Sequence, residues 1–217
     1  MKVTIVYDNL LFRKDLGLIS DWGFACLIDT GGETILFDTG AKGNILINNM
    51  NRLDIDPNII DKIVVSHEHW DHNRGLKELL LHIKRVELYS LEKKYNYENI
   101  NLISVENFMK ITDKVYTTGK LKGQIEEQSL LIKGKKGWCI IVGCSHPGVE
   151  EILNVARHNF KIIGLIGGLH GFNKFEVLKN LRFICPCHCT VNKKILYEIF
   201  SDKIIKCGVG KIINLDH

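Results

Sequence analysis

Short apolar runs bounded by polar or glycine residues recur along the chain, and runs of this kind predict β-strands. They lie at residues 3–7, 23–30, 34–38, 63–65, 86–89, 129–132, 138–142, 162–166 and 183–185. Gly31-Gly32 separates the second run from the third, and residues 134–137 separate 129–132 from 138–142. Both spacings predict β-hairpins.

Longer amphipathic stretches lie between these runs and predict helices. Residues 44–61 indicate a helix followed by a connector, and Thr190 is placed to cap a further helix near the end of the chain. Residues 91–127 show no clear period. Apolar side chains recur at helical spacing in two sets, which are Leu76, Leu79, Leu80 and Ile83, and Val149, Ile152, Leu153 and Ala156. Two strand-rich halves with helices between them favour a layered α/β fold.

Length and composition are those of a single globular domain. The 217 residues can form one substantial core, and 45% hydrophobic with 25% charged residues is ordinary for a soluble protein. The formal net charge of +4 favours a small anionic substrate. The lysines are scattered along the chain, which argues against a nucleic-acid partner.

The cysteines and the start of the chain bear on its location. The chain enters a strand pattern at once, without the apolar region of a signal peptide, and no apolar run reaches the roughly 20 residues of a membrane span. The seven cysteines are odd in number, and Cys185, Cys187 and Cys189 alternate. No small disulfide framework fits them, so we expect a cytoplasmic protein with reduced cysteines.

Metal-binding side chains are concentrated directly after the run 63–65. His67, His69, Asp71 and His72 lie within six residues, and imidazole with carboxylate suits zinc, iron or manganese. A regular helix would separate His69 from the others, and one loop cannot complete the coordination, so further ligands must come from elsewhere.

His146, His170 and His188 are available for this, and each follows a predicted strand. Loops at one edge of a sheet can converge on a point.

These motifs resemble a known family. The pattern His-x-His-x-Asp-His at 67–72 resembles the signature of the metallo-β-lactamase superfamily, and residues 34–40 are similar to its hairpin ending in Asp-Thr-Gly. Residues 143–148 and 186–190 fall where its later histidines are expected. With Gly167-Gly-Leu-His170 they resemble a branch of metal-dependent hydrolases. That branch includes an archaeal enzyme that joins a dihydropterin to a ribofuranosyl-aminobenzene phosphate.

The resemblance implies a fold and a ligand set. The fold would be the four-layer αββα sandwich, formed as one domain over residues 1–217. One or two divalent ions would be bound, with zinc favoured and iron or manganese possible. Asp38 would support the metal loop by orienting its imidazoles, although a carboxylate at a strand end could also simply cap a turn. The implied ligands are His67, His69 and His146 for one metal, and Asp71, His72 and His188 for the other.

The sequence also departs from the family pattern. Most dinuclear members have an aspartate that bridges both metals after the strand that follows the third histidine, whereas here that strand leads to His170. His170 could bind a metal, hold the substrate, donate a proton or simply pack, or the second metal could be weakly held. We interpret the alternating cysteines as reduced side chains near the site rather than as a zinc site, and the role of Cys144 stays open.

The expected function is metal-dependent hydrolysis of a small anionic molecule, with phosphorylated and pterin-like compounds as the candidates. The metal would lower the pKa of bound water to about 7. Asp71 would orient this water besides binding metal, and His170 would protonate the leaving group. One alternative is a transferase that condenses a dihydropterin diphosphate with an aminobenzene ribofuranosyl phosphate. Another is a metal-holding binding or redox scaffold without turnover. The substrate and the oligomeric state stay open.

Overall fold

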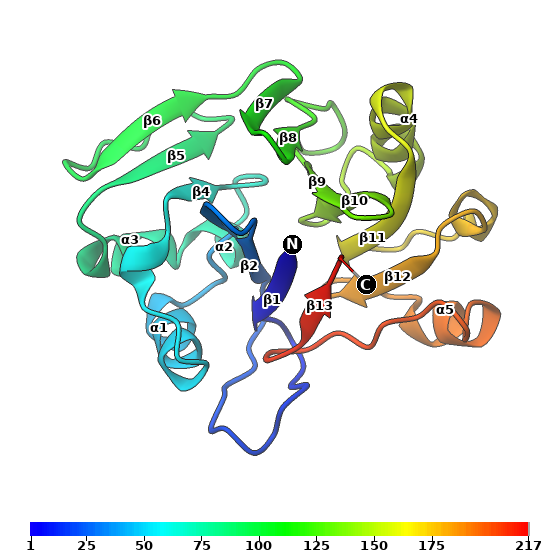
Figure 1. Cartoon of the computed structure of the whole chain (residues 1–217), viewed down its shortest axis with the longest axis horizontal. Coiled ribbons are helices and arrows are strands. Elements are labelled where there is room, and N and C mark those ends of the chain that lie inside the picture. The colour runs from blue at the N-terminus through cyan, green and yellow to red at the C-terminus, as the bar shows by residue number, and fades with distance from the viewer. Residues whose placement is uncertain (217) are drawn as a thin grey trace.

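Two β-sheets pack face to face in the computed structural model, which describes residues 1–216 (Figure 1). The first sheet has the order β13-β1-β2-β3-β4-β5-β6, and the second has the order β12-β11-β10-β9-β8-β7. Strands of the first are β1 (Lys2–Tyr7), β2 (Ala25–Asp29), β3 (Thr34–Phe37), β4 (Lys62–Val64), β5 (Val86–Ser90), β6 (Ile100–Ser104) and β13 (Ile212–Asn214). Strands of the second are β7 (Met109–Thr112), β8 (Val115–Thr117), β9 (Leu130–Gly134), β10 (Gly137–Val142), β11 (Ile162–Gly168) and β12 (Phe183–Cys187).

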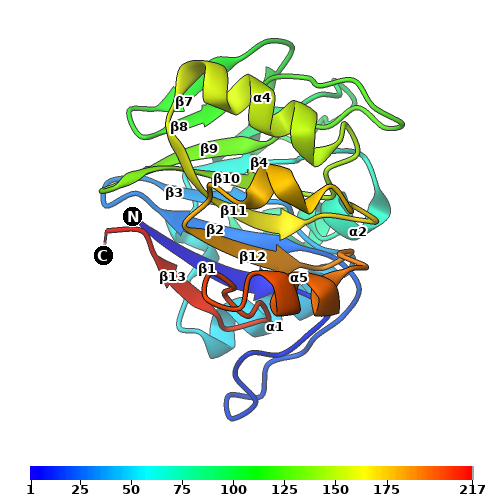
Figure 2. The same ribbon diagram turned by 90° about the vertical axis from the view of Figure 1, so that its right-hand side faces the viewer.

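Helices cover the outer faces of both sheets, as Figures 1 and 2 show. The first sheet carries α1 (Gly43–Arg52), α2 (Trp70–Asn73) and α3 (Leu76–Leu79), with short 3₁₀ turns at Pro57–Ile59 and Leu80–His82. The second carries α4 (Val149–Asn159), a 3₁₀ turn at Phe175–Leu178 and α5 (Lys193–Ile199). None of the described helices has the length and apolar character to span a bilayer.

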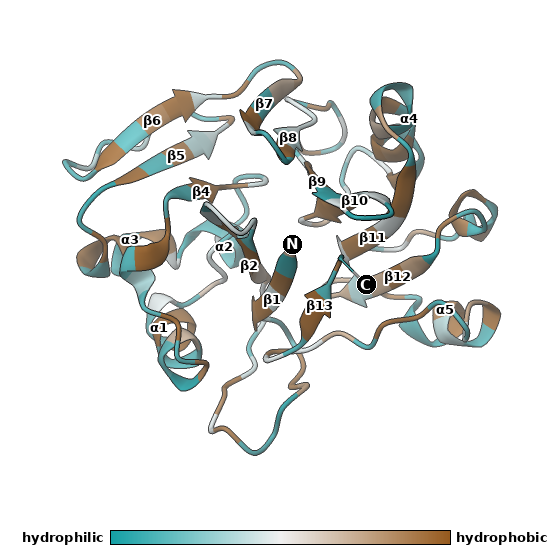
Figure 3. Ribbon diagram, viewed as in Figure 1, coloured by the Kyte–Doolittle hydropathy of each residue, from teal (hydrophilic) through white to brown (hydrophobic). Residues whose placement is uncertain are grey.

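Three separate hydrophobic clusters hold these layers together. The inner one joins the facing sides of both sheets and includes Ile28, Ile132 and Ile166. A second packs the first sheet against α1 and α3, and a third packs the second sheet against α4 and α5. The strands are accordingly mostly hydrophobic along their length (Figure 3). This arrangement confirms the predicted α/β class and the four-layer αββα sandwich as one domain over the described residues.

Parallel pairing sets where the loops meet. β3 pairs in parallel with β4, and β11 pairs in parallel with both β10 and β12. Because the carboxyl ends of parallel strands lie at the same edge, the loops that follow these strands are neighbours. Each predicted histidine ligand lies in or beside one of these loops.

The predicted hairpins are confirmed, since β2 pairs antiparallel with β3 and β9 with β10. Residues 91–127, for which no element was predicted, contain β6, β7 and β8. Strand β6 is exposed or half-buried along its length, which removes the alternation that marks a strand.

The predicted cap at Thr190 is wrong. Asn192 precedes α5, whereas the Thr190 hydroxyl donates to the carbonyl of Cys187 and accepts from the amide of Leu169. Thr190 therefore ties the ends of β11 and β12 together instead of starting the helix.

Gly75 offers a test of how tightly the loop after β4 packs on the end of β3. A Cβ at Gly75 would lie 2.0 Å from the carbonyl oxygen of Thr39, whereas a Cβ at Gly32 would meet no atom within 4 Å. We expect Gly75→Ala to lower the free energy of unfolding by about 1–3 kcal/mol, the usual cost of overpacking. Thermal or urea unfolding measures this loss, and Gly32→Ala is the matched control. Equal stability of the two variants would contradict the described packing.

Candidate metal centre

The six predicted ligands meet at the carboxyl-terminal edge of the two sheets. In the first set, the ring centroids of His67 and His69 are 4.7 Å apart, and those of His67 and His146 are 4.5 Å apart. In the second set, the His72 and His188 centroids are 5.0 Å apart, and His188 Nε2 lies 3.1 Å from Asp71 Oδ2. The sets adjoin, since the His67 and His72 rings are 4.2 Å apart. The structure thus brings the six residues together, and both their role as ligands and their division into two sets remain predictions.

Asp38 and Ser66 orient two of the imidazoles. Asp38 Oδ1 accepts from the Ser66 amide, and Asp38 Oδ2 lies 2.8 Å from Ser66 Oγ and 2.7 Å from His72 Nδ1. The Ser66 hydroxyl donates its one proton to Asp38, so it accepts from His67 Nδ1 at 2.8 Å. This network assigns the Nδ1–H tautomer to His67 and His72, which leaves each Nε2 free to bind metal. Asp38 thus contacts both Ser66 and His72, and its support of a metal site stays a prediction.

Glu127 orients His146, and sequence reasoning missed it. One carboxylate oxygen of this fully buried residue accepts from the amides of Gly143, Cys144 and Ser145. The other oxygen accepts from the His146 amide and lies 2.9 Å from His146 Nδ1. Burial alone would raise the pKa of Glu127, but the hydrogen bonds from His146 and the amides lower it to about 2.

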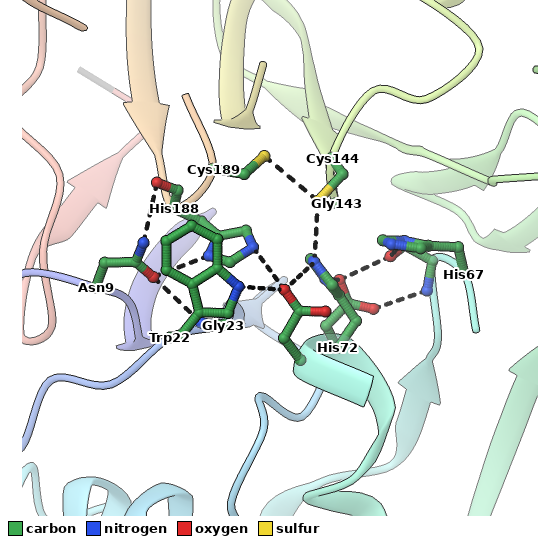
Figure 4. Close-up of polar contacts among 12 residues, drawn as sticks. Asn9, Trp22, Gly23, His67, His72, Gly143, Cys144, His188 and Cys189 are labelled. Atoms are coloured by element: carbon green, nitrogen blue, oxygen red, sulfur yellow. Dashed lines mark hydrogen bonds and ion pairs between the residues drawn. The ribbon is translucent and has the colours of Figure 1, made fainter. Parts of the chain in front are cut away.

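Asn9 orients His188, as Glu127 orients His146. Its side-chain oxygen lies 2.9 Å from His188 Nδ1, and its amide donates to the His188 carbonyl oxygen (Figure 4). The buried Asp8 beside it accepts from the His188 amide. Both residues follow β1, about 180 positions earlier in the chain, so no local motif could have identified them.

The electrostatics of the site favour neutral imidazoles. Burial lowers the pKa of His67 to about 2 and that of His72 to about 3, and burial also lowers the pKa of His69. These rings are neutral at pH 7, the form that binds metal. Nε2 of His67 is buried without a hydrogen-bond partner, whereas Nε2 of His188 has the Asp71 carboxylate beside it. An orphaned, unprotonated nitrogen in a protein interior is costly unless a cation binds it, so the donor set fits a metal.

Trp22 and His188 both contact the carboxylate of Asp71. Its Oδ2 accepts from Trp22 Nε1 at 2.8 Å and lies beside His188. Burial would raise the pKa of Asp71, but the contact with His188 and the nearby His72 outweigh burial and hold this pKa well below its usual value. The carboxylate therefore stays ionised. The link to Trp22 was not predicted, because Trp22 lies in the loop before β2.

His170 lies at the rim of the cluster. Its Nε2 is 3.2 Å from His146 Nε2, and the side chain is exposed rather than buried. It lines an open pocket of about 640 Å³ together with His69, Gln124, Ile125, Ser145, His146 and Gly171. His170 therefore lies at the edge where it was predicted. Whether it acts as a metal ligand, a substrate contact or a proton donor stays open.

Backbone strain is concentrated in the same loops. Asp38, Ser145, His170 and His188 all have positive φ, between 41° and 64°, a conformation that non-glycine residues rarely adopt. Strained residues persist where the surrounding structure holds them, and they are frequent at functional sites. The strain therefore agrees with a functional site at this edge and does not depend on the residue types.

All seven cysteines are free and buried. The structure separates the alternating three, because Cys185 and Cys187 lie in the inner core whereas Cys189 reaches the site. The Sγ atoms of Cys189 and Cys144 are 3.3 Å apart, and Cys144 Sγ lies 3.1 Å from His72 Nε2 (Figure 4).

Comparison with known proteins agrees with this site. Residues 23–146 match the model of the metallo-beta-lactamase superfamily. An uncharacterised protein of Methanocaldococcus jannaschii is 26% identical and aligns over 98% of this chain and 100% of its own length. From the same organism, 7,8-dihydropterin-6-methyl-4-(beta-D-ribofuranosyl)-aminobenzene-5'-phosphate synthase is also 26% identical, over 83% of this chain and 84% of its own.

A solved structure shares the whole fold. It is titled as Tm1679, a metal-dependent hydrolase of the beta-lactamase superfamily, and it superposes with a TM-score of 0.81 at 24% identity over 100% of both chains. The family match covers more than half of the chain and contains the motif 67–72 and His146. The chain therefore belongs to the metallo-beta-lactamase superfamily.

Proposed function

We propose that this protein is a metal-dependent hydrolase of a small anionic substrate. The observation that carries the proposal is the buried, partnerless Nε2 of His67, which lies beside the neutral imidazoles of His69 and His72. His67, His69 and His146 would hold one divalent ion, and Asp71, His72 and His188 a second. Zinc suits this nitrogen-rich set best, although iron and manganese also accept it.

The chemistry divides between the ions and the chain. Bound ions would supply Lewis acidity, which activates water at neutral pH and polarises a carbonyl or phosphoryl oxygen. Ser66, Asp38, Glu127 and Asn9 hold the ligating rings in place. His170, exposed in the pocket, would face the substrate and donate a proton to the leaving oxygen.

The pocket supports a small, negatively charged substrate. Its volume of about 640 Å³ is in the range of small-molecule sites, and no acidic side chain lines it. The chain carries a formal net charge of +4, which adds a weak attraction for anions. A phosphorylated or pterin-like molecule would meet these conditions.

A transferase reaction is the second candidate, and the similarity to the M. jannaschii synthase favours it. Incubation with a dihydropterin diphosphate separates the two, with and without the aminobenzene ribofuranosyl phosphate as acceptor. A hydrolase releases diphosphate without the acceptor, whereas a transferase forms the condensed product only when the acceptor is present. The proposed hydrolysis would be contradicted if the metal-loaded protein hydrolysed neither this compound nor any member of a panel of phosphate esters and lactones.

The free cysteines support a cytoplasmic location. All seven are unpaired, and Cys144 and Cys189 are close enough to be oxidised together. A reducing compartment keeps such thiols intact.

Removal of two ligands should abolish metal binding at one position. We expect His67→Ala/His69→Ala to lose at least one of two equivalents of zinc, because three nitrogen ligands become one. Metal analysis of protein purified without chelator measures this, and the exposed His82 gives the control variant His82→Ala, which should keep its metal. Full occupancy in the double variant would remove these histidines from the ligand set.

Removal of an orienting carboxylate should weaken metal binding without unfolding the chain. We expect Asp38→Asn and Glu127→Gln each to lower zinc affinity by about 10–100-fold, the usual cost of losing such a partner. Competition with a chromogenic chelator measures the affinity. Asp61 also accepts from a backbone amide but precedes β4 at the opposite edge, so Asp61→Asn is the control. Unchanged affinity with a lower melting temperature would favour turn capping at Asp38.

His170→Ala separates the roles open to that residue. If His170 is a proton donor, turnover should fall by about 10²–10⁴-fold with metal content unchanged. Kinetic and metal assays of the same preparation test this. A loss of one ion per chain would identify a ligand instead, and no change in either would exclude both roles for His170.

A further inference from the structure

We propose that the thiolate of Cys144 is a ligand shared by the two metal positions. The inference rests on the proposed metal centre and adds a seventh donor to it. It also fills a chemical gap, because no carboxylate follows β11 and Asp71 is the only anionic side chain among the six predicted ligands.

Position is the first argument. The ligand atoms of His67, Cys144 and His146 all lie within 4.8 Å of one another, and so do those of His72, Cys144 and His188. Each trio belongs to a different predicted metal position, and Cys144 is the member they share among the described residues. Figure 4 shows the Cys144 sulfur between Cys189 and His72, with dashed contacts to both.

A close contact between two candidate ligand atoms is the second argument. Cys144 Sγ lies 3.1 Å from His72 Nε2, and both side chains are buried. A cation bound by both atoms would replace this contact, and cysteine binds metal as the thiolate.

The unpartnered nitrogen of His67 is the third argument. Its Nε2 is buried without a hydrogen-bond partner, whereas Nε2 of His188 in the other trio has the Asp71 carboxylate beside it. His67 comes from the loop after β4 and His188 from the loop after β12, so the two trios reach the same sulfur from different loops. A cation bound beside Cys144 would give the His67 nitrogen its missing partner.

Charge gives the shared ligand its function. Two-metal sites hold their ions about 3.5–4 Å apart, where two dications repel strongly unless an anion lies between them. Cys144 is 2% exposed, and Glu127 fixes its backbone through the Cys144 amide. A thiolate held there offsets the repulsion, and sulfur also favours zinc over magnesium or calcium.

Cobalt titration of the metal-free protein under reducing conditions tests the proposal. Thiolate ligation of Co²⁺ gives a charge-transfer band in the near ultraviolet, whereas histidine and carboxylate ligation give only the weaker visible bands. We expect the wild-type chain to bind two equivalents and to show both features. Cys144→Ala should lose the charge-transfer band and weaken binding of both equivalents by more than the roughly 10–100-fold of an outer partner.

Two controls make the outcome decisive. Cys189→Ala removes the neighbouring thiol and should keep the band, so loss of the band only in this variant would identify Cys189 as the ligand and overturn the proposal. Cys144→Ser preserves the volume should the alanine variant fail to fold, and it too should lose the band.

X-ray absorption of the zinc-loaded wild-type protein needs no variant. A sulfur neighbour at about 2.3 Å from zinc is expected, and its absence would contradict the shared thiolate. The outcomes also separate the two proposals. Binding of cobalt without a charge-transfer band overturns only the role of Cys144, whereas no cobalt binding at all overturns the metal centre itself.

Discussion

The orientation of four buried imidazoles is the constraint on which the rest of the site depends. Each of these rings directs its Nδ1 to a side-chain oxygen. The pairs are His67 with Ser66, His72 with Asp38, His146 with Glu127, and His188 with Asn9. Their Nε2 atoms are therefore left for the centre of the cluster. Because a ring that turned by half a rotation would lose this bond and aim the wrong nitrogen, the hydrogen bonds fix both the tautomer and the direction of each candidate ligand.

The sheets make this arrangement possible. Parallel pairing brings the loops after β3 and β4 to one edge, and the loops after β10, β11 and β12 reach the same edge from the second sheet. Packing of the two sheets on a shared apolar core then sets one group of loops against the other. The cost is visible in positive φ at Asp38 and His188, and in the lowered pKa of His67 and His72. Strained and desolvated groups of this kind are frequent at functional sites, in agreement with the proposed metal centre.

The sequence was most informative where chemistry is local. The motif at 67–72 identified the cluster, and strand ends identified His146 and His188, because a ligand loop after a strand is visible in a short window. Glu127 was missed for the opposite reason. It has no metal-binding neighbour in the sequence, and its four amide contacts come from a turn about 18 residues later. The roles of Asn9 and Trp22 likewise depend on contacts that only the packed sheets create.

The central claim is that this edge holds two metal ions at two defined positions. Anomalous diffraction from crystals of the zinc-loaded protein tests it most directly. The account predicts two peaks per chain, one bounded by His67, His69 and His146 and the other by Asp71, His72 and His188, with each Nε2 or Nδ1 ligand at about 2.0–2.1 Å from zinc. A fully loaded crystal with zinc peaks only outside this cluster would contradict it.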